Sequence, residues 1–378
     1  MNSRPDFQTI YNNQFMKFLN TIALLTGVTL TTSLAEKGDH QHINHQHGNR
    51  PDLHAPISIM GDHLHHKGGW MISHRFMFME MDDLYLGNDR ISPSTSFAAN
   101  YTVTPTRMSM QMQMLGVMYA PTENITLMAM VPYIDLEMDH AIFPGAAPLI
   151  GLNGGRSGFT TRATGLGDLR LSSLFRIFTR ENNSLHGAVG VSLPTGAINE
   201  QDLVPGPGGL LLRQLPAAMQ LGSGTLDILP SLTWVHRGDD WSAGAQMRGV
   251  IRTMSNYHDY RLGDQFATDV WISWNATNSY SLSAGLGYLW EDELSGIQSD
   301  VGLNPPFAPT RRTVTTAFSE NYGGQRIETI LGVNLVAPSG PLEGHRFSFD
   351  LRIPLWQDRN GIALGTTYTV TAGWRYAF

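Results

Sequence analysis

Histidine is concentrated near the start of the chain, at spacings that could bind a metal. Nine of the 14 histidines lie between residues 40 and 74. Imidazole is the commonest ligand for borderline ions such as Cu(II), Zn(II) and Ni(II). The sequence therefore predicts transition-metal binding, with a solvated histidine-rich tract that binds metal only adventitiously as the alternative. The candidate ligands are His40, His42, His45, His47, His63, His65 and His66.

Methionine is enriched in the same part of the chain. Of the 18 methionines, 13 lie between Met60 and Met138. Thioether sulfur is a soft ligand that selects Cu(I), so methionine beside histidine favours copper handling as one hypothesis. Met77, Met79 and Met81 share the parity of Arg75 on their expected strand, which makes them the candidate thioether ligands.

The composition argues against several classes of protein. The 378 residues carry 25 Lys+Arg and 32 Asp+Glu, a formal charge of −7, which disfavours nucleic acid as a partner. Cysteine does not occur, so disulfides, thiolate nucleophiles and cysteine-bound metals are excluded. Charged residues make up only 15% of the chain, against about 25% in soluble domains. A low charge without a long apolar run is typical of a transmembrane β-barrel.

The end of the chain shows the barrel pattern most clearly. From Thr367 to Phe378, one parity is apolar and largely aromatic, and the other is small or polar. This alternation is typical of a strand between lipid and a wet lumen. The terminal Phe378 resembles the signal read by the barrel assembly machinery, which is therefore an expected partner. We predict the outer membrane of a Gram-negative bacterium as the location.

The same period of two recurs upstream and predicts an all-β fold, a transmembrane antiparallel barrel of twelve strands. Short turns alternate with long loops between the strands, so both termini are expected on the periplasmic side. A soluble sandwich or lipocalin-like barrel fits poorly because charged residues recur along the strands. The expected strands cover residues 70–81, 107–119, 125–134, 168–177, 185–193, 226–235, 241–252, 266–276, 280–290, 326–336, 345–355 and 367–378.

Two segments precede the barrel, which is expected to span residues 68–378. Residues 1–35 are predicted to be a signal peptide, because a basic start and an apolar stretch lead to the small-x-small pattern Ser33-Leu34-Ala35. Either Met1 or Met16 is the start residue. Residues 36–67 are polar and histidine-rich without a strand period, so we predict a flexible, disordered periplasmic arm.

Parity assigns most charged side chains of the strands to the lumen. Arginine outnumbers the acidic residues among them, so an inward positive surplus is expected to favour anionic solutes. Mutual pairing that plugs a narrow barrel is the alternative. On the expected strand 107–119, Met108, Met110, Met112 and Met114 then face lipid, where methionine is apolar filler. The predicted pore-lining residues are Arg75, Arg107, Asp168, Arg170, Arg176, Asp227, Arg248, Arg252, Asp269, Arg326, Glu328, Arg346, Asp350, Arg352 and Arg375.

Catalytic signals are poor. The outward histidines His74 and His236 lack a serine at a matching level, so a phospholipase-like pair on the barrel surface is not expected. We therefore expect no enzyme and no cofactor, apart from the copper or other transition metal considered above.

Several glycine-rich motifs resemble one known family. Over residues 68–378 the chain is similar to the MetA-pathway-of-phenol-degradation family of outer-membrane transporters. The resemblance implies an outer-membrane channel for small, often aromatic solutes, and it supplies no catalytic residues. The expected function is passive passage of small anionic or aromatic solutes across the lipid, with a copper-binding envelope protein as the alternative. The motifs are Gly165-Leu166-Gly167-Asp168-Leu169-Arg170, Gly190-Val191-Ser192-Leu193-Pro194-Thr195-Gly196, Gly222-Ser223-Gly224-Thr225-Leu226-Asp227 and Gly373-Trp374-Arg375-Tyr376-Ala377-Phe378.

Overall fold

The computed structural model describes residues 50–206, 208–302 and 310–378. They belong to one compact unit that runs from residue 47 to the end of the chain. The predicted signal peptide, and the candidate ligands His40, His42, His45 and His47, lie outside the described residues. In the described part, no helix is long and apolar enough to cross a membrane.

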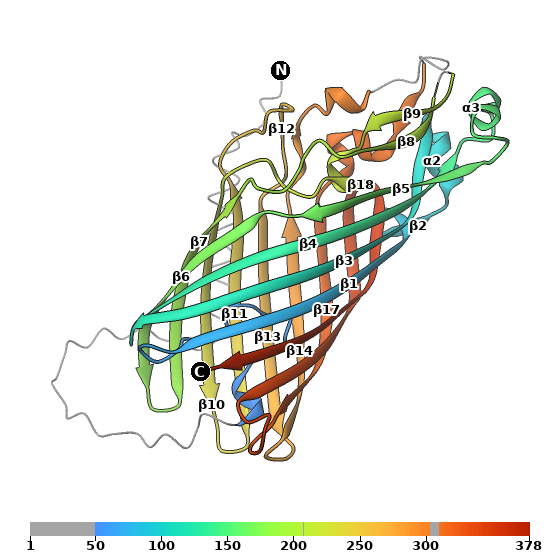
Figure 1. Cartoon of the computed structure of the whole chain (residues 1–378). Coiled ribbons are helices and arrows are strands. Elements are labelled where there is room, and N and C mark those ends of the chain that lie inside the picture. Colours follow the sequence, from blue (N-terminus) through green and yellow to red (C-terminus); the bar gives the residue numbers. More distant parts are fainter. Residues whose placement is uncertain (1–49, 207, 303–309) are drawn as a thin grey trace, which may run out of the picture. The chain divides into compact units, whose positions relative to one another are not determined.

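A closed antiparallel β-barrel forms the wall of this unit (Figure 1). Neighbouring strands follow the order β3, β1, β18, β17, β14, β13, β11, β10, β7, β6 and β4, and β4 pairs with β3 to close the ring. This confirms the predicted all-β barrel. The wall strands are β1 (Trp70–Gly87), β3 (Tyr101–Thr122), β4 (Ile125–Ile142), β6 (Leu169–Arg180), β7 (Asn183–Leu193), β10 (Asp227–Arg237), β11 (Trp241–Arg252), β13 (Gln265–Asn275), β14 (Tyr280–Glu291), β17 (Gly324–Val336) and β18 (His345–Ala377).

The long element β18 crosses the wall twice. Residues 346–359 pair with β17, and residues 359–377 pair with β1, antiparallel in both cases. A closed ring of antiparallel neighbours needs an even number of crossings, because each neighbour reverses direction. The two limbs of β18 are also joined to each other, since the Gln357 side chain accepts from Thr366 N at 2.9 Å and donates to Thr366 O at 3.2 Å. They correspond to the last two predicted strands, and the long loop expected between these strands is itself extended.

One position of the wall is interrupted. β5 (Gly158–Leu166) and β6 both pair with β4, one after the other, and Gly167 and Asp168 separate them. On its far side β6 pairs with β7, whereas β5 meets the loop hairpin of β8 (Gln201–Gly206) and β9 (Gly209–Gln214). Arg162 N of β5 donates to the Asp202 carboxylate at 2.7 Å. The regular ladder of the barrel therefore ends at Gly167 on this side.

The remaining elements lie in the loops. Short strands and helical turns fold the connections opposite the end of the wall where Trp70 N donates to Phe378 O at 2.8 Å. They are β2 (Asp89–Ile91), β12 (Tyr260–Arg261), β15 (Ser295–Gly296), β16 (Arg312–Val314), α2 (Pro93–Ala98), α3 (Ala147–Leu152), η3 (Ala217–Met219), η4 (Ser299–Val301), η5 (Thr315–Ala317) and η6 (Ser319–Asn321), while η2 (Pro51–Leu53) precedes the first wall strand.

Residues 50–66 run inside the barrel and are called here the luminal plug. Ile57 and Ile59 are 0% and 1% exposed. The plug backbone bonds to inward side chains of several strands: Gln246 donates to Met60 O at 2.9 Å, His186 donates to Gly61 O at 2.8 Å, and Asn334 donates to His54 O at 3.1 Å. The prediction of a disordered arm is therefore wrong for residues 50–66. Polar wall residues form hydrogen bonds with the backbone of this segment, while its isoleucine side chains are buried away from water.

Twelve methionines form one inner face on β1, β3 and β4, called here the methionine wall. Thr126, on the same face of β4 as Met128 and Met130, accepts a hydrogen bond from the plug residue His65, which identifies this side as the lumen. Directly opposite one another across the strands lie Met71 and Met118, Met77 and Met112, Met79 and Met110, Met81 and Met108, Met108 and Met138, and Met118 and Met128, with Met114 and Met130 in the same rows.

Two predictions for β3 are wrong. Met108, Met110, Met112 and Met114 face the lumen, and Arg107 faces outward, where it forms an ion pair with Glu80. The parity rule assumes that the polar face of a strand is the wet inner face. Here the inner face of β3 carries methionine side chains, and Arg107 lies toward the end of the wall opposite Trp70 and Phe378.

Candidate functional site

A cavity of about 340 Å³ lies in the lumen, above the plug. Its floor is formed by plug residues, one side by the methionine wall, and its roof by loop residues 217–223. Its lining is mixed, with thioether and aliphatic groups opposite charged and hydroxyl groups. The lining includes Ile57, Met60, Arg75, Met77, Met112, Met114, Met130, Asp168, Arg170, Gly222, Ser223, Asp227 and Arg252.

Two arginines of the cavity have donors left over. Arg75 is 5% exposed, and among the described residues its guanidinium makes one hydrogen bond, from Nη1 to the Met130 sulfur at 4.0 Å. Its Nε is buried without a hydrogen-bond partner among the described residues. Arg170 lines the same cavity, and within the described residues it makes no ion pair shorter than 4.0 Å. Burying a guanidinium with unmet donors is costly, so these two side chains are the parts of the lining that favour an anionic guest.

The acidic residues of the cavity are already engaged. The Asp168 carboxylate accepts from Gly196 N at 2.9 Å, from Ser223 N at 2.8 Å and from Ser223 Oγ at 2.9 Å. Asp227 forms an ion pair with Arg252 and accepts from Thr225 Oγ1 at 2.5 Å. Among the described residues, neither carboxylate forms an ion pair with Arg75 or Arg170 within 4.0 Å, although both attract Arg170 through space.

Three of the glycine motifs meet at the interruption in the wall. A Cβ on Gly222 would lie 2.6 Å from the Asp168 carboxylate and 2.6 Å from Gly196 O, and a Cβ on Gly196 would lie 2.8 Å from Gly222 Cα. At Gly167 a Cβ would lie 2.7 Å from the Ile134 side chain. Glycine therefore allows the loops after β7 and before β10 to close on Asp168. These residues are called here the Asp168 junction.

The wall opposite the methionines carries an ion-pair network. Arg352 Nη1 lies 2.9 Å from the Asp269 carboxylate and 2.7 Å from the Glu328 carboxylate, and Arg326 binds Glu328 at 3.0 Å. Arg248 pairs with Asp269 from the other side. The network also holds the plug, because Arg352 Nε donates to Ser58 Oγ at 2.8 Å and Asp350 accepts from Ser58 N at 2.7 Å.

The structure divides the predicted pore-lining residues into groups. The remaining arginines lie at the level of the plug or its rim: Arg346 donates to Arg50 O at 3.1 Å, Arg375 approaches Asp62 at 3.8 Å, and Arg176 donates to Glu123 O at 3.0 Å. Most inward-facing charged side chains therefore form ion pairs or hold the plug in place. Except for Arg107, every predicted residue is placed on the inner side or at the junction.

Several site residues were not predicted. Ile57, Ser58 and Met60 belong to the stretch Ala55-Pro56-Ile57-Ser58-Ile59-Met60, whose alternating apolar residues interrupt a polar segment. That alternation was the available signal that the segment packs against something. The roof at residues 217–223 had no comparable signal, because its position depends on contacts with a distant strand end.

The candidate metal ligands fall in different surroundings. His63 and His65 lie in the plug with buried Nε2 atoms that lack partners among the described residues, whereas the His66 side chain is 83% exposed beside Glu123. His54 and Asp62 join His63 in one cluster, which sequence reasoning missed. Burial lowers the pKa of His54 well below its usual value and that of His65 to about 3. Burial opposes ionisation of Asp62, but His63 and His54 outweigh it and hold the pKa of that carboxyl well below its usual range.

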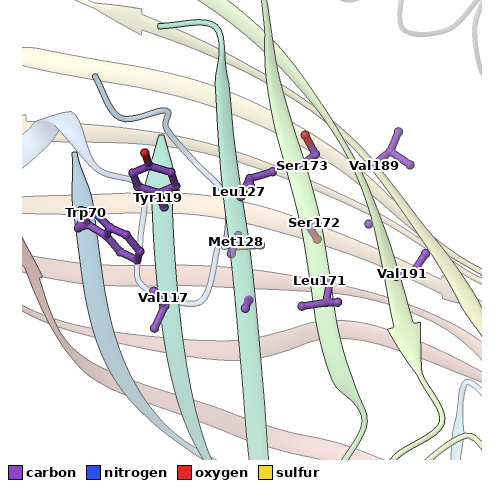
Figure 2. Close-up of a pocket in the computed structure, with 12 residues that line it drawn as sticks. Trp70, Val117, Tyr119, Leu127, Met128, Leu171, Ser172, Ser173, Val189 and Val191 are labelled. Atoms are coloured by element: carbon purple, nitrogen blue, oxygen red, sulfur yellow. The ribbon is translucent and has the colours of Figure 1, made fainter. Parts of the chain in front are cut away.

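A larger hollow, of about 570 Å³, lies on the outer side of the wall (Figure 2). Trp70, Tyr119, Leu127 and Val189 border it, and the rings of Trp70 and Tyr119 are 4.5 Å apart. Apolar side chains dominate its lining, as expected of a surface that contacts lipid. It is therefore not a candidate solute site.

Comparisons with known proteins agree with this architecture. The model of the family described as the MetA pathway of phenol degradation matches residues 92–308, more than half of the chain. The fold is similar to that of the COG4313 outer membrane channel from Pseudomonas putida F1, with a TM-score of 0.55 and 13% identity over 85% of this chain and 100% of that one. The β domain of the Bordetella autotransporter BrkA gives a TM-score of 0.43 and 13% identity over 82% of this chain and 100% of that one. No curated protein sequence matches the chain.

The fold and the family match define the class of protein. This is an outer-membrane β-barrel with the fold of an outer-membrane channel. The chain belongs to the MetA-pathway-of-phenol-degradation family, which confirms the resemblance seen in its glycine motifs.

Proposed function

We propose that the barrel is a passive channel for small solutes that combine an apolar, preferably aromatic, body with an anionic group. The observation that carries this proposal is the luminal cavity, which Arg75 and Arg170 line together with the methionine wall and in which, among the described residues, neither arginine forms an ion pair within 4.0 Å. No covalent chemistry is required, because the cavity offers a binding site along a path rather than a nucleophile and base.

The methionine wall suits the apolar part of such a solute. Thioether side chains are unbranched and polarisable, so they adapt to differently shaped ligands and make favourable contacts with aromatic rings. Met77 and Met112 lie directly opposite each other beside Arg75, and both line the cavity. A ring placed here would contact sulfur and methylene groups while its substituent reaches the guanidinium.

The arginines suit the anionic part. A guanidinium offers up to five donors in a fixed plane and binds carboxylates with two parallel hydrogen bonds. A carboxylate between Arg75 and Arg170 would supply an acceptor for Arg75 Nε, which has no partner among the described residues. A neutral hydrocarbon would leave these donors unmet, so it is expected to bind less well than its carboxylate relative.

Passage requires movement at the boundaries of the cavity. The plug closes the floor, and the Asp168 junction lies where the wall ladder is interrupted. The junction is held by a few hydrogen bonds from loops and side chains, whereas the rest of the wall is held by continuous strand pairing. The junction is therefore the weaker part of the enclosure. We propose that the solute leaves the cavity when the plug or the junction shifts.

A binding and flux experiment tests this proposal. Benzoate, phenol, benzylamine and toluene are offered to the full chain in detergent and in planar bilayers. We expect benzoate to bind best of the four. In R75M and R170M the affinity for benzoate should fall by about tenfold or more for each lost charged hydrogen bond, and the flux of benzoate should fall with it. The matched control is R162M, because Arg162 is a surface arginine paired with Glu137 outside the lumen.

Two results would contradict the proposal. Equal binding of benzoate and benzylamine would show that the arginines do not select charge. An unchanged benzoate affinity in the R75M R170M double variant would remove the cavity from the path altogether.

Copper handling remains a second candidate, and the methionine wall is the observation that favours it. Clustered thioethers bind Cu(I) in preference to harder ions. Cu(I) titration of the full chain and of M77L/M112L would separate the two functions. Loss of a bound Cu(I) in that variant, with benzoate affinity preserved, would favour copper handling.

A further inference from the structure

The plug holds a group of metal-ligand side chains below the solute cavity. The side chains of His54, Asp62 and His63 each offer one ligand atom, and these atoms all lie within 4.8 Å of one another. His63 Nδ1 is 2.8 Å from Asp62 Oδ1, and His54 Nδ1 is 3.3 Å from Asp62 Oδ2. We propose that this group is a transition-metal site, for Zn(II) or Cu(II), which clips the two ends of the plug loop together.

The spacing of the group fits a metal that binds nitrogen and oxygen. Metal–ligand bonds of about 2.0–2.2 Å in a tetrahedral site place neighbouring ligand atoms roughly 3.3 Å apart. Of the two distances from Asp62, the one to His54 matches this value and the one to His63 is shorter by about 0.5 Å. Small side-chain rotations would therefore admit an ion, whereas the backbone can stay in place.

A second observation also points to a ligand. His65 Nε2 is buried and has no hydrogen-bond partner among the described residues. The rings of His63 and His65 are 4.8 Å apart, and those of His54 and His63 are 4.3 Å apart. Three imidazoles thus lie around one carboxylate, and His65 can supply the fourth ligand of a tetrahedral site.

The surroundings limit how tightly the site binds. Arg375 Nη1 lies 3.8 Å from Asp62 Oδ1 and 3.4 Å from His54 Nδ1. Its charge repels a divalent ion, although its contact with His54 Nδ1 requires a lone pair on that nitrogen, which is the state that a metal needs. We therefore expect a reversible regulatory site that is weaker than a structural zinc site.

The position of the site defines its effect. His54 and Asp62 close a loop whose tip, Ser58, is held by Asp350 and Arg352 of the wall. Metal binding would join the base of this loop while the wall holds its tip. The plug would then be locked in the lumen, and removal of the metal would loosen it. This inference does not depend on which solute the channel carries.

The binding test uses the full chain without an affinity tag, in detergent. His40, His42, His45 and His47 are first changed to alanine together, so that they cannot contribute. Calorimetric titration with Zn(II) and with Cu(II) is expected to show one bound ion for each chain, and H54A/H63A is expected to abolish it. H66A, which alters an exposed histidine, should leave the stoichiometry unchanged. An unchanged titration in H54A/H63A, or no bound ion in the starting protein, would overturn the proposal.

A channel measurement tests whether metal binding holds the plug in the lumen. Micromolar Zn(II) is expected to reduce open-channel current fluctuations severalfold, and EDTA should restore them. H63C should keep the Zn(II) response because a thiolate can replace the imidazole, whereas H63A should lose it. This rescue separates metal binding from simple damage to the plug. Zn(II) binding without any change in current would contradict the clip, and benzoate affinity measured in EDTA reports on the solute site independently.

Discussion

The two sides of the barrel wall fill the lumen with different chemistry. On β1, β3 and β4 the inner face is rich in thioethers, whereas on β11, β13, β17 and β18 it carries a network of arginines and carboxylates. The outer face is apolar on both sides, but β3 also carries outward polar residues. Gln111 and Gln113 point outward from β3, whereas Phe347, Phe349 and Ile353 point outward from β18.

The difference shows what the inner face of each side has to contact. The charged side holds the plug, and its side chains supply hydrogen bonds to a buried backbone. The methionine side borders the cavity, so its side chains need shape and polarisability rather than donors. Polar residues on one face of a strand therefore identify the luminal face only where polar groups, such as the plug backbone, lie against that face.

The largest effect is expected on the charged side, at Arg352. R352M leaves Asp269 and Glu328 buried with one cation fewer and removes the contact with Ser58. Breaking a buried ion pair from one side costs about 3–5 kcal/mol. Urea unfolding in detergent, followed by the heat-modifiable mobility of the folded barrel, should show this loss. A loss as small as that of a surface pair would mean that the network is solvated.

A smaller effect is expected where the two sides are joined, at the Asp168 junction. G222A places a methyl group 2.6 Å from the Asp168 carboxylate, so the loops must separate. Overpacking of this kind costs about 1–3 kcal/mol. The same unfolding assay should show the loss, together with a leakier channel. G151A is the matched control, because a Cβ at Gly151 meets nothing within 4 Å. Equal behaviour of the two variants would show that the junction is not tight.

A still smaller change in stability is expected on the methionine side. M112L keeps the volume and apolar character of the wall and should cost less than about 1.5 kcal/mol. Solute affinity should nevertheless fall severalfold, because leucine is branched and adapts less well to a ring. The comparison of benzoate titration with unfolding separates the two effects. A stability loss as large as that of R352M would mean that the methionines are a rigid core.

The smallest effect is expected at Arg107, which sharpens the assignment of the two faces. Its pairing with Glu80 is on the outer side of the wall and the arginine side chain is 46% exposed, which screens the pair, so R107M should change stability by about 1 kcal/mol. The anion preference of the channel should also be unchanged. A marked loss of that preference would return Arg107 to the lumen and contradict the observed register.

Much of the wall could be predicted because a strand records its two environments in alternate residues. The final strand, ending at Trp374, Tyr376 and Phe378, shows this pattern without ambiguity. At β3 the rule gave the wrong face, since glutamine and arginine point outward and methionine points inward. The sequence of that strand alone does not indicate which of its two faces points into the lumen. Only pairing with β1 and β4, whose neighbours touch the plug, decides it.

The candidate site was predicted in its residue types but not in its grouping. Arg75 and Arg352 were both expected in the lumen, yet among the described residues Arg75 forms no ion pair within 4.0 Å and Arg352 forms two. Their partners come from strands far apart in the chain, so spacing along the sequence cannot reveal them. The same holds for His54, which joins His63 only because the plug folds back inside the barrel.

The amino-acid sequence alone determined the all-β class, the membrane-facing strands and the family, because these depend on local alternation and on short motifs. The tertiary structure decided that residues 50–66 occupy the lumen, that the methionines line it, and that the glycine motifs meet at Asp168. These features depend on closure of the barrel, which brings distant residues together and gives each strand an inside.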